Sequence, residues 1–185
     1  MTVGLLGLQG AFRDHRRHVR QLGHADRIVR STGDLAAVER LIIPGGESTV
    51  MAMYLREFGM LDPLRRRIAD GMPMWGICAG AILLAQTVDD APGVVGAMEI
   101  AVQRNAYGRQ DASDVHALDV ADLGRPAFPG LFIRAPRISA HSGRVKVLAR
   151  FGSDPVFVRQ ERLMATTFHP ELTDDPVFHA YFLSL

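Results

Sequence analysis

The stretch Pro73-Met74-Trp75-Gly76-Ile77-Cys78-Ala79-Gly80-Ala81-Ile82-Leu83-Leu84-Ala85 decides the fold, because it predicts a buried strand that leads directly into a helix. Met72 to Ile77 is an apolar run of strand length, and Ala79 to Gln86 is rich in Ala and Leu, which favour a helix. Cys78, the only cysteine in the chain, falls at the joint within Gly76-x-Cys78-x-Gly80. That spacing is typical of a nucleophile elbow with sulfur in place of oxygen.

The chemistry of such an elbow explains the two glycines. A sharp strand-to-helix turn holds the nucleophile in a strained backbone conformation, so its neighbours must lack bulk. Free backbone N–H groups at the start of the helix favour a thiolate and can stabilise an oxyanion. A buried structural cysteine is the alternative, since free cysteine is among the most buried residue types. The flanking glycines favour the elbow, which then requires a base, an orienting group and a second oxyanion donor elsewhere.

Composition limits the classes of function. The 185 residues suit one compact domain, and we expect residues 1–185 to form a single unit. With 21 basic and 20 acidic residues the net charge is +1, which gives no case for nucleic acid or an acidic membrane surface as a partner. A single cysteine fits a reducing compartment, and Met1 to Leu6 lacks the basic region of a signal peptide. No apolar run could span a bilayer, so we expect a cytoplasmic protein.

The first half of the chain alternates strands and helices. Strands are predicted at 3–8, 26–29, 40–43 and 72–77, and helices at 11–22, 35–38, 49–58, 61–70 and 79–86. This order predicts an α/β fold, a three-layer sandwich with a mostly parallel central sheet. Its site should lie at the carboxyl ends of the strands.

The second half is richer in strands. Strands are predicted at 97–104, 131–134 and 144–149, a hairpin at 156–160 and 163–167, and a closing helix at 176–185, whereas 87–96 is expected to be a loop.

A glycine turn, Pro44-Gly45-Gly46-Glu47-Ser48-Thr49, follows the predicted strand at 40–43. We expect Ser48 or Thr49 to cap the next helix. Such a loop presents backbone N–H groups at a helix start and therefore favours an anion site over an ordinary tight turn. It lacks the Lys of a phosphate-binding P-loop, which disfavours nucleotide binding.

The candidate base lies in Phe168-His169-Pro170-Glu171, after the last predicted strand. Pro170 restricts His169 to an extended conformation, and in an extended chain residues two apart share a face, so His169 and Glu171 can point the same way. A carboxylate that orients an imidazole and an imidazole that takes a thiol proton are the partners that Cys78 needs. The alternatives are a surface histidine without a role and a zinc site. The zinc site would need further cysteines, and Cys78 is the only one, so no metal is expected.

These motifs together resemble those of a known family. Cys78 in its elbow with His169-Pro170-Glu171 is similar to the triad of class I glutamine amidotransferases. More narrowly, the chain resembles the glutaminase subunits of pyridoxal phosphate synthases. The supporting stretches, in the family's order, are Gly7-Leu8-Gln9-Gly10, the glycine turn at 44–49, Arg104-Asn105-Ala106-Tyr107-Gly108-Arg109-Gln110, Phe132-Ile133-Arg134-Ala135-Pro136 and Phe168 to Thr173.

The resemblance implies a glutaminase that releases ammonia from L-glutamine for a separate synthase subunit in a hetero-oligomeric complex, which builds pyridoxal phosphate. It implies that Cys78 attacks the side-chain amide to form a thioester, that His169 is base and then acid, and that Glu171 orients it. The amides of Gly46 and Ala79 would form the oxyanion hole. By the same resemblance, glutamine would be held by Gly46, Glu47, Ser48, Arg104, Ile133 and Arg134, Gln9 would face the partner, and no metal or cofactor is expected.

Two departures from the family stand out. Ile77 replaces a small polar residue before the nucleophile, and we expect it to point into the core. The stretch 111–116 is more polar than is typical, which affects a local strand or a partner contact there but not the triad.

Two other functions stay open at this stage. The triad would equally fit the glutaminase of another ammonia-using pathway, such as histidine or nucleotide synthesis. Related folds also carry an elbow cysteine as a non-catalytic oxidation sensor. Such proteins usually lack a His-Pro-Glu base, so His169 and Glu171 count against a sensor.

Overall fold

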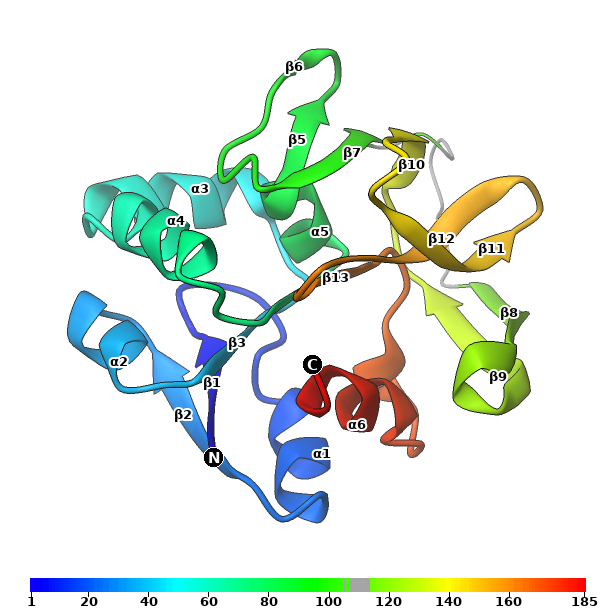
Figure 1. Cartoon of the computed structure of the whole chain (residues 1–185), viewed down its shortest axis with the longest axis horizontal. Helices are drawn as coiled ribbons and strands as arrows, with labels where there is room; N and C mark the ends of the chain where they lie inside the picture. Colours follow the sequence, from blue (N-terminus) through cyan, green and yellow to red (C-terminus); the bar gives the residue numbers. More distant parts are fainter. Residues whose placement is uncertain (105, 107–113) are drawn as a thin grey trace.

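The chain is built around a seven-stranded sheet, described by a computed structural model that covers residues 1–104, 106 and 114–185. Its strand order is β11-β12-β13-β4-β3-β1-β2 (Figure 1). The neighbours from β2 to β13 pair in parallel, and β12 and β11 complete the sheet with antiparallel pairings. These strands are β1 (Thr2–Leu6), β2 (Ala25–Val29), β3 (Arg40–Ile43), β4 (Met74–Ile77), β11 (Lys146–Phe151), β12 (Asp154–Gln160) and β13 (Leu163–Thr166).

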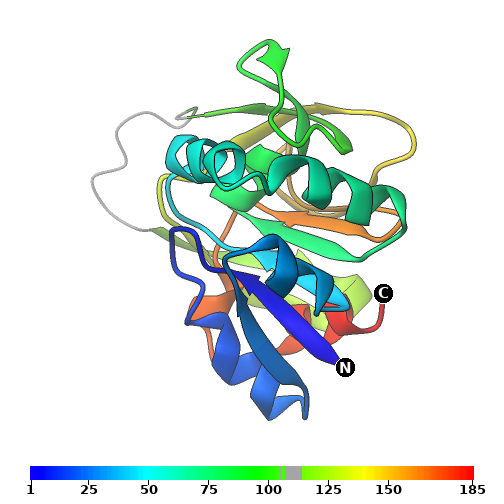
Figure 2. The same ribbon diagram turned by 90° about the vertical axis from the view of Figure 1, so that its left-hand side faces the viewer.

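Helices cover both faces of this sheet (Figures 1 and 2). On one face lie α2 (Thr32–Ala36), α3 (Ser48–Glu57), α4 (Leu61–Ala69) and α5 (Ala79–Leu84), and on the other lie α1 (His15–Gln21) and α6 (Val177–Leu183). Within the described ranges, none of the helices combines the length and apolar character needed to cross a membrane. The expected three-layer α/β architecture with a mostly parallel central sheet is confirmed.

Alternation along the strands divides the core into two clusters. In β3, Leu41 and Ile43 pack with the cluster under α2 to α5, whereas Ile42 packs with the cluster under α1 and α6. Trp75 and Ile77 of β4 belong to the second cluster. Ile77 is fully buried, as expected for the residue before the elbow. Burial of each apolar side chain stabilises the fold by removing its surface from water. Because these strands are buried on both faces, their side chains contribute to both core clusters.

Two smaller sheets complete the chain. One has the order β10-β7-β5-β6, with β5 (Ala85–Val88), β6 (Ala91–Pro92), β7 (Met98–Gln103) and β10 (Arg137–His141), and lies on the same side as α3 to α5 (Figure 2). The other pairs β8 (Asp114–Val120) with β9 (Arg125–Phe132), joined by a 3₁₀ turn (Ala121–Leu123).

The structure corrects several local predictions. The segment 87–96 is not all loop, because β5 (Ala85–Val88) and β6 (Ala91–Pro92) pair there as a hairpin. The helix α5 ends at Leu84 rather than Gln86. The helix after the glycine turn begins at Ser48 with Glu47 as its N-cap, so neither Ser48 nor Thr49 caps it. The helix predicted from Ala11 begins at His15. The hairpin at 156–167 and the strand at 40–43 are confirmed.

The central sheet brings three loops together at one edge. β4 pairs in parallel with β3 on one side and with β13 on the other. Gly45-Gly46 lie in the segment after β3, Cys78 follows β4 directly, and His169 lies in the segment after β13. Because the carboxyl ends of parallel strands meet at the same edge, residues far apart in the sequence converge there. The stretch 105–113, apart from Ala106, lies outside the described residues.

Candidate active site

Cys78 sits on a strained turn between β4 and α5. Its backbone has φ of 49°, in the left-handed region, and it is the N-cap of α5. A Cβ on Gly80 would lie 2.1 Å from the carbonyl oxygen of Ile43, and one on Gly76 would lie 2.5 Å from the Gly80 carbonyl group. Both glycines are therefore required by close backbone approach, which explains the spacing of the elbow.

The elbow is fixed to the neighbouring strands. The backbone N–H of Cys78 donates to the Thr166 carbonyl at 2.8 Å, and the indole N–H of Trp75 donates to the Thr166 hydroxyl at 3.1 Å. The Cys78 side chain is 7% exposed, and its Sγ lies 4.0 Å from the Ile133 carbonyl oxygen, a weak thiol hydrogen bond. The sulfur thus faces a loop from the second half of the chain while its backbone stays locked in the sheet.

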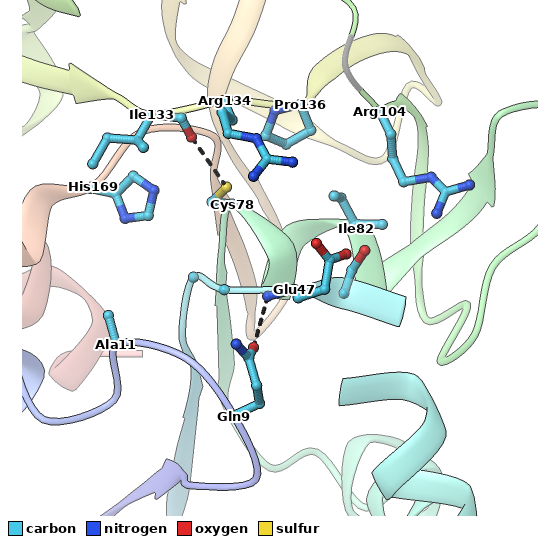
Figure 3. A pocket seen from close by; sticks show the side chains of 13 residues that line it. Gln9, Ala11, Glu47, Cys78, Ile82, Arg104, Ile133, Arg134, Pro136 and His169 are labelled. Atoms are coloured by element: carbon cyan, nitrogen blue, oxygen red, sulfur yellow. Dashed lines mark hydrogen bonds between the residues drawn. The ribbon is translucent and has the colours of Figure 1, made fainter. Parts of the chain in front are cut away.

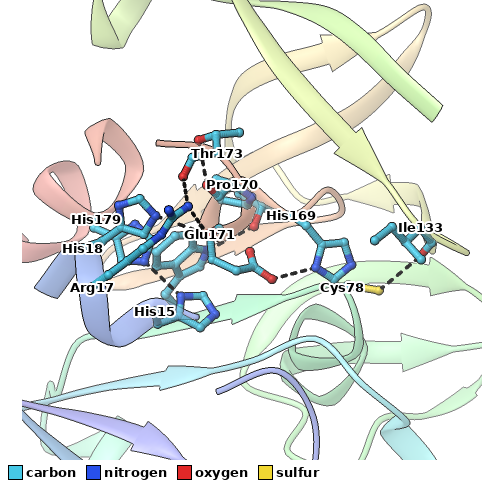
Figure 4. Close-up of polar contacts among 12 residues, drawn as sticks. His15, Arg17, His18, Cys78, Ile133, His169, Pro170, Glu171, Thr173 and His179 are labelled. Carbon is cyan, nitrogen blue, oxygen red and sulfur yellow. Dashed lines mark hydrogen bonds and ion pairs between the residues drawn. The ribbon is translucent and has the colours of Figure 1, made fainter. Parts of the chain in front are cut away.

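His169 and Glu171 form the buried pair that the sequence predicted. Nδ1 of His169 lies 2.7 Å from Oε1 of Glu171, which is fully buried. Nδ1–H therefore donates to the carboxylate and leaves Nε2 for the side that faces Cys78 (Figure 4). The local geometry differs from the expected extended chain, because Glu171 lies in a 3₁₀ turn (Pro170–Leu172). His169 itself has φ of −108° and ψ of 82°, and its N–H is anchored to the Leu131 carbonyl at 2.8 Å.

Electrostatics favour an ionised pair. Burial lowers the pKa of His169, but hydrogen bonds with Cys78 and Glu171 outweigh it and raise this pKa to about 10. Burial raises the pKa of Glu171, but the hydrogen bond from His169 and the nearby rings of His15 and His169 hold it below its ordinary value. Glu171 is therefore an anion at neutral pH, and it favours a proton on His169.

The glycine turn after β3 lies against the triad. A Cβ on Gly45 would come within 2.4 Å of the His169 ring, and Gly46 has φ of 153°. The Gly45 carbonyl accepts from the N–H of Ala11 at 3.0 Å, and the N–H of Glu47 donates to Oε1 of Gln9 at 2.7 Å (Figure 3). The turn at residues 7–11 thus holds the glycine turn on both sides.

A cavity of about 480 Å³ joins these groups (Figure 3). Its walls contain Cys78, His169, the glycine turn and every residue expected to hold glutamine: Gly46, Glu47, Ser48, Arg104, Ile133 and Arg134. Ala79, the second expected oxyanion donor, is the first residue of α5 and is buried next to Cys78. Gln9 lines the same cavity, and its contact with a partner stays a prediction.

Two arginines approach the cavity from different loops. Arg104 is fixed by Asp89, whose carboxylate accepts from the Arg104 backbone N–H at 2.8 Å and from Nε at 2.7 Å. Arg134 has φ of 46°, an uncommon conformation for a residue with a side chain. A planar guanidinium is suited to grip a carboxylate in two-point fashion, so both positions fit the recognition of an α-amino acid.

No cluster of three or more metal-binding side chains occurs among residues 1–104, 106 and 114–185. A thiol on a strand-to-helix elbow, an imidazole hydrogen-bonded to a buried carboxylate and a cavity lined by two arginines together fit acyl transfer on a small amino acid.

The family model of the SNO glutamine amidotransferase family matches residues 5–185. The chain belongs to this family. It is 48% identical over 192 residues to the pyridoxal 5'-phosphate synthase subunit PdxT of Deinococcus radiodurans, with 100% of this chain and 97% of that protein covered. The PdxT of Thermus thermophilus is 46% identical over 187 residues, again covering 100% and 97%. A crystal structure of a glutamine amidotransferase superposes with a TM-score of 0.91 at 44% identity, covering 98% of this chain and 97% of that one.

Several residues around this amidotransferase site were not predicted from the sequence. Ala11, Ile82 and Pro136 line the cavity, and Thr166 anchors the elbow. His15, His18 and His179 are fully buried behind Glu171, although no sequence motif marks them in the way that His-Pro-Glu marks His169. Their signal was the spacing of His15 and His18, which places both on one face of a helix. The arginines between and beside these histidines made the helix look solvent-exposed on all sides, so the buried face was not recognised.

Proposed function

We propose that the chain is the glutaminase subunit of a pyridoxal phosphate synthase and that Cys78, His169 and Glu171 perform its chemistry. The observation that carries the proposal is the buried His169–Glu171 pair at 2.7 Å, in one cavity with the elbow cysteine. Family membership supports glutamine hydrolysis as the reaction. The relatives named as PdxT support the synthase subunit as the consumer of the ammonia.

In the first half-reaction, His169 Nε2 takes the thiol proton of Cys78, and the thiolate attacks the side-chain amide carbon of glutamine. The negative charge that develops on the amide oxygen is stabilised by the N–H groups of Gly46 and Ala79. His169 then gives its proton to the departing nitrogen, the C–N bond breaks, and ammonia leaves. The product on the enzyme is a γ-glutamyl thioester of Cys78.

In the second half-reaction, neutral His169 takes a proton from water, and the resulting hydroxide attacks the thioester carbonyl. The same two N–H groups stabilise the second oxyanion. Collapse breaks the C–S bond, releases glutamate and returns the proton to the thiolate of Cys78. Glu171 stays ionised throughout and stabilises the imidazolium in both halves.

Glutamine is oriented by its backbone groups. The guanidinium groups of Arg104 and Arg134 would bind the α-carboxylate, and the carboxylate of Glu47 would bind the α-ammonium group. Ser48 and the backbone of Ile133 line the remaining wall. The exposed positions of Glu47 and Arg104 fit a substrate that enters from solvent.

The partner acts through the turn that contains Gln9. Gln9 bonds to the N–H of Glu47, and Ala11 bonds to the carbonyl of Gly45, so any movement of this turn reaches the Gly45–Gly46 peptide. Docking of the synthase subunit beside Gln9 would therefore set the orientation of the Gly46 N–H, one of the two oxyanion donors. Residues 1–185 would act as one glutaminase domain, and its need for a reduced thiol favours a reducing compartment such as the cytoplasm.

Glutamate release from glutamine tests the proposal, measured with the purified chain alone and with the synthase subunit of the same organism. We expect strong stimulation by the partner and loss of activity in Cys78→Ala, which should keep its fold. Gln9→Leu should lower the stimulated rate about 10-fold through loss of the hydrogen bond to the Glu47 N–H, whereas Gln21→Leu, at the exposed end of α1, should not. Wild-type glutamate release by Cys78→Ala would refute the assigned chemistry.

A further inference from the structure

Three buried histidines lie behind the candidate active site, on the side of Glu171 that faces away from Cys78. His15 and His18 belong to α1 and His179 to α6, and all three are 0% exposed. Nδ1 of His15 lies 2.9 Å from Nε2 of His179, and the His18 and His179 rings stack with centroids 4.3 Å apart. Buried polar side chains of this kind need partners, because an unsatisfied group costs free energy.

The helix α1 holds the segment of Glu171 at several points. His18 Nε2 lies 3.2 Å from the Glu171 carbonyl oxygen, and the guanidinium of Arg17 donates to the same oxygen at 3.2 Å. Arg17 also donates to the carbonyl of Thr173. These bonds fix the backbone of the 3₁₀ turn but do not involve the carboxylate of Glu171.

Only one of the two carboxylate oxygens of Glu171 has a hydrogen-bond partner among the described residues. Oε1 accepts from His169, whereas buried Oε2 has no hydrogen-bond partner among the described residues. Nε2 of His15 is likewise buried and without a partner in the described part of the chain. His15 lies beside Glu171, opposite to His169 (Figure 4), and the two groups interact electrostatically.

We propose that His15 is a positioning residue of the triad, whose Nε2–H serves the second carboxylate oxygen of Glu171, directly or through one buried water. This inference rests on the proposed role of Glu171. The resulting chain of contacts runs from His179 through His15 and Glu171 to His169 and Cys78. It fixes the carboxylate from behind, as a second partner of the kind that orients catalytic side chains.

The tautomer follows from elementary chemistry. A neutral imidazole has one N–H and one lone pair, so His15 can serve only one of its two neighbours as a donor. With the lone pair on Nδ1, His15 accepts from Nε2–H of His179 and directs its own N–H to the carboxylate. The reverse tautomer would turn a lone pair toward an anion, which is unfavourable. Burial supports a neutral ring, because it lowers the pKa of His15 to about 4.

Three substitutions separate this role from a purely structural one. The amide nitrogen of Gln reaches the position of Nε2, whereas that of Asn reaches only the position of Nδ1. His15→Gln therefore keeps a donor toward Glu171, His15→Asn keeps only the contact with His179, and His15→Leu keeps neither. Glutaminase activity is measured in the complex with the synthase subunit, as kcat, KM and their pH dependence, with thermal unfolding as the measure of the fold.

We expect His15→Asn and His15→Leu to lose about 10-fold in kcat with little change in KM, and His15→Gln to recover most of it. The acid limb of the kcat profile should move to higher pH in the first two variants, because Glu171 loses a donor. The groups that face His15, and therefore share this profile, are Asp14 at the N-cap of α1, His18 on α1, His179 on α6, and Glu171 and His169. Wild-type kcat and pH profile in His15→Asn would overturn the proposal, as would equal losses in His15→Gln and His15→Leu.

The wild-type chain gives an independent test that does not depend on the folding of a variant. Long-range ¹H–¹⁵N correlation spectra at neutral pH report the tautomer of each histidine ring. We expect His15 to be neutral with its proton on Nε2, and a proton on Nδ1 would overturn the proposal. Cys78→Ala distinguishes failure of the triad from failure of the His15 role. If Cys78→Ala remains active, the proposed triad is wrong. If Cys78→Ala is inactive while His15→Asn equals the wild type, only the proposed role of His15 is wrong.

Discussion

The Nδ1 atom of His169 lies 2.7 Å from Oε1 of Glu171, although a single proline separates the two residues in the chain. Contact at this range is possible because His169 ends an extended segment and Pro170 starts a 3₁₀ turn that brings Glu171 back beneath the ring. The pair is buried, and Nε2 of the His169 ring faces Cys78, which follows β4 directly (Figure 4). Sheet topology and one local turn thus bring together the three residues of the proposed triad.

Glu171→Gln keeps the shape of the side chain but removes its charge. The pKa of His169, raised to about 10 in the wild type, should fall, because one of its two raising partners is lost. We expect kcat for glutamine hydrolysis to drop about 10²- to 10⁴-fold with an intact fold. Glu57→Gln, on the exposed end of α3, is the matched control and should leave kcat unchanged. A Glu171→Gln enzyme with wild-type kcat would show that the carboxylate has no part in the reaction.

Gly80→Ala tests the close approach that seats the elbow. The added Cβ would lie 2.1 Å from the Ile43 carbonyl oxygen, and backbone cannot move aside as a side chain can. We expect a loss of about 2 kcal/mol or more in the free energy of unfolding, with reduced activity. Gly33→Ala is the control, because its nearest atom would be the Ser31 hydroxyl at 3.8 Å. Equal unfolding midpoints for the two variants in urea would contradict the packing argument.

Asp89→Asn tests how Arg104 is positioned for glutamine. Asp89 holds both the backbone and the Nε of Arg104, at 2.8 and 2.7 Å. The pair is exposed, so its loss should raise KM for glutamine only about 5-fold while kcat stays unchanged. Asn tolerates the left-handed conformation of this turn, and Asp90→Asn changes the neighbouring charge in the same turn as a control. An unchanged KM in Asp89→Asn would show that the ion pair with Asp89 does not position Arg104 for glutamine binding.

Stability should depend on pH through the buried histidines. Burial lowers the pKa of His15 from 6.5 to about 4, so the folded state resists its protonation. The stabilisation is fully present above pH 6.5 and is lost as the pH falls toward 4. We expect the wild type to lose roughly 3 kcal/mol more than His15→Gln between about pH 7 and about pH 4, measured by urea unfolding. Parallel losses in the two proteins would mean that His15 already carries its charge in the fold.

Much of the architecture could be predicted from the sequence because the first half is strongly patterned. Buried parallel strands are continuous apolar runs, and the glycines at 45, 46, 76 and 80 mark turns that only small residues can form. The strand at 40–43 was predicted with its observed bounds, and the hairpin at 156–167 with nearly the same bounds. The Cys78 elbow and the His169–Glu171 pair were predicted for the same reason, since each is a local motif.

The remaining features depend on contacts that local pattern does not encode. The strands β5, β6, β8 and β10 were not predicted, because they lie in small sheets and carry polar or mixed residues on one face. The burial of His15, His18 and His179 depends on the meeting of α1 and α6 beneath the sheet. Arg13, Arg16, Arg17 and Arg20 recur at a spacing that is typical of a solvated helix face, although Arg17 in fact binds the segment of Glu171.

The most direct test of the account is to trap the glutamyl thioester. The complex with the synthase subunit is mixed with glutamine, quenched with acid during turnover, digested and analysed by mass spectrometry. We predict a glutamyl adduct on the peptide that contains Cys78, removed by hydroxylamine and absent in Cys78→Ala. The opposite result would be steady glutamate release with no adduct on that peptide, together with release by Cys78→Ala at the wild-type rate. It would show that Cys78 is not the nucleophile.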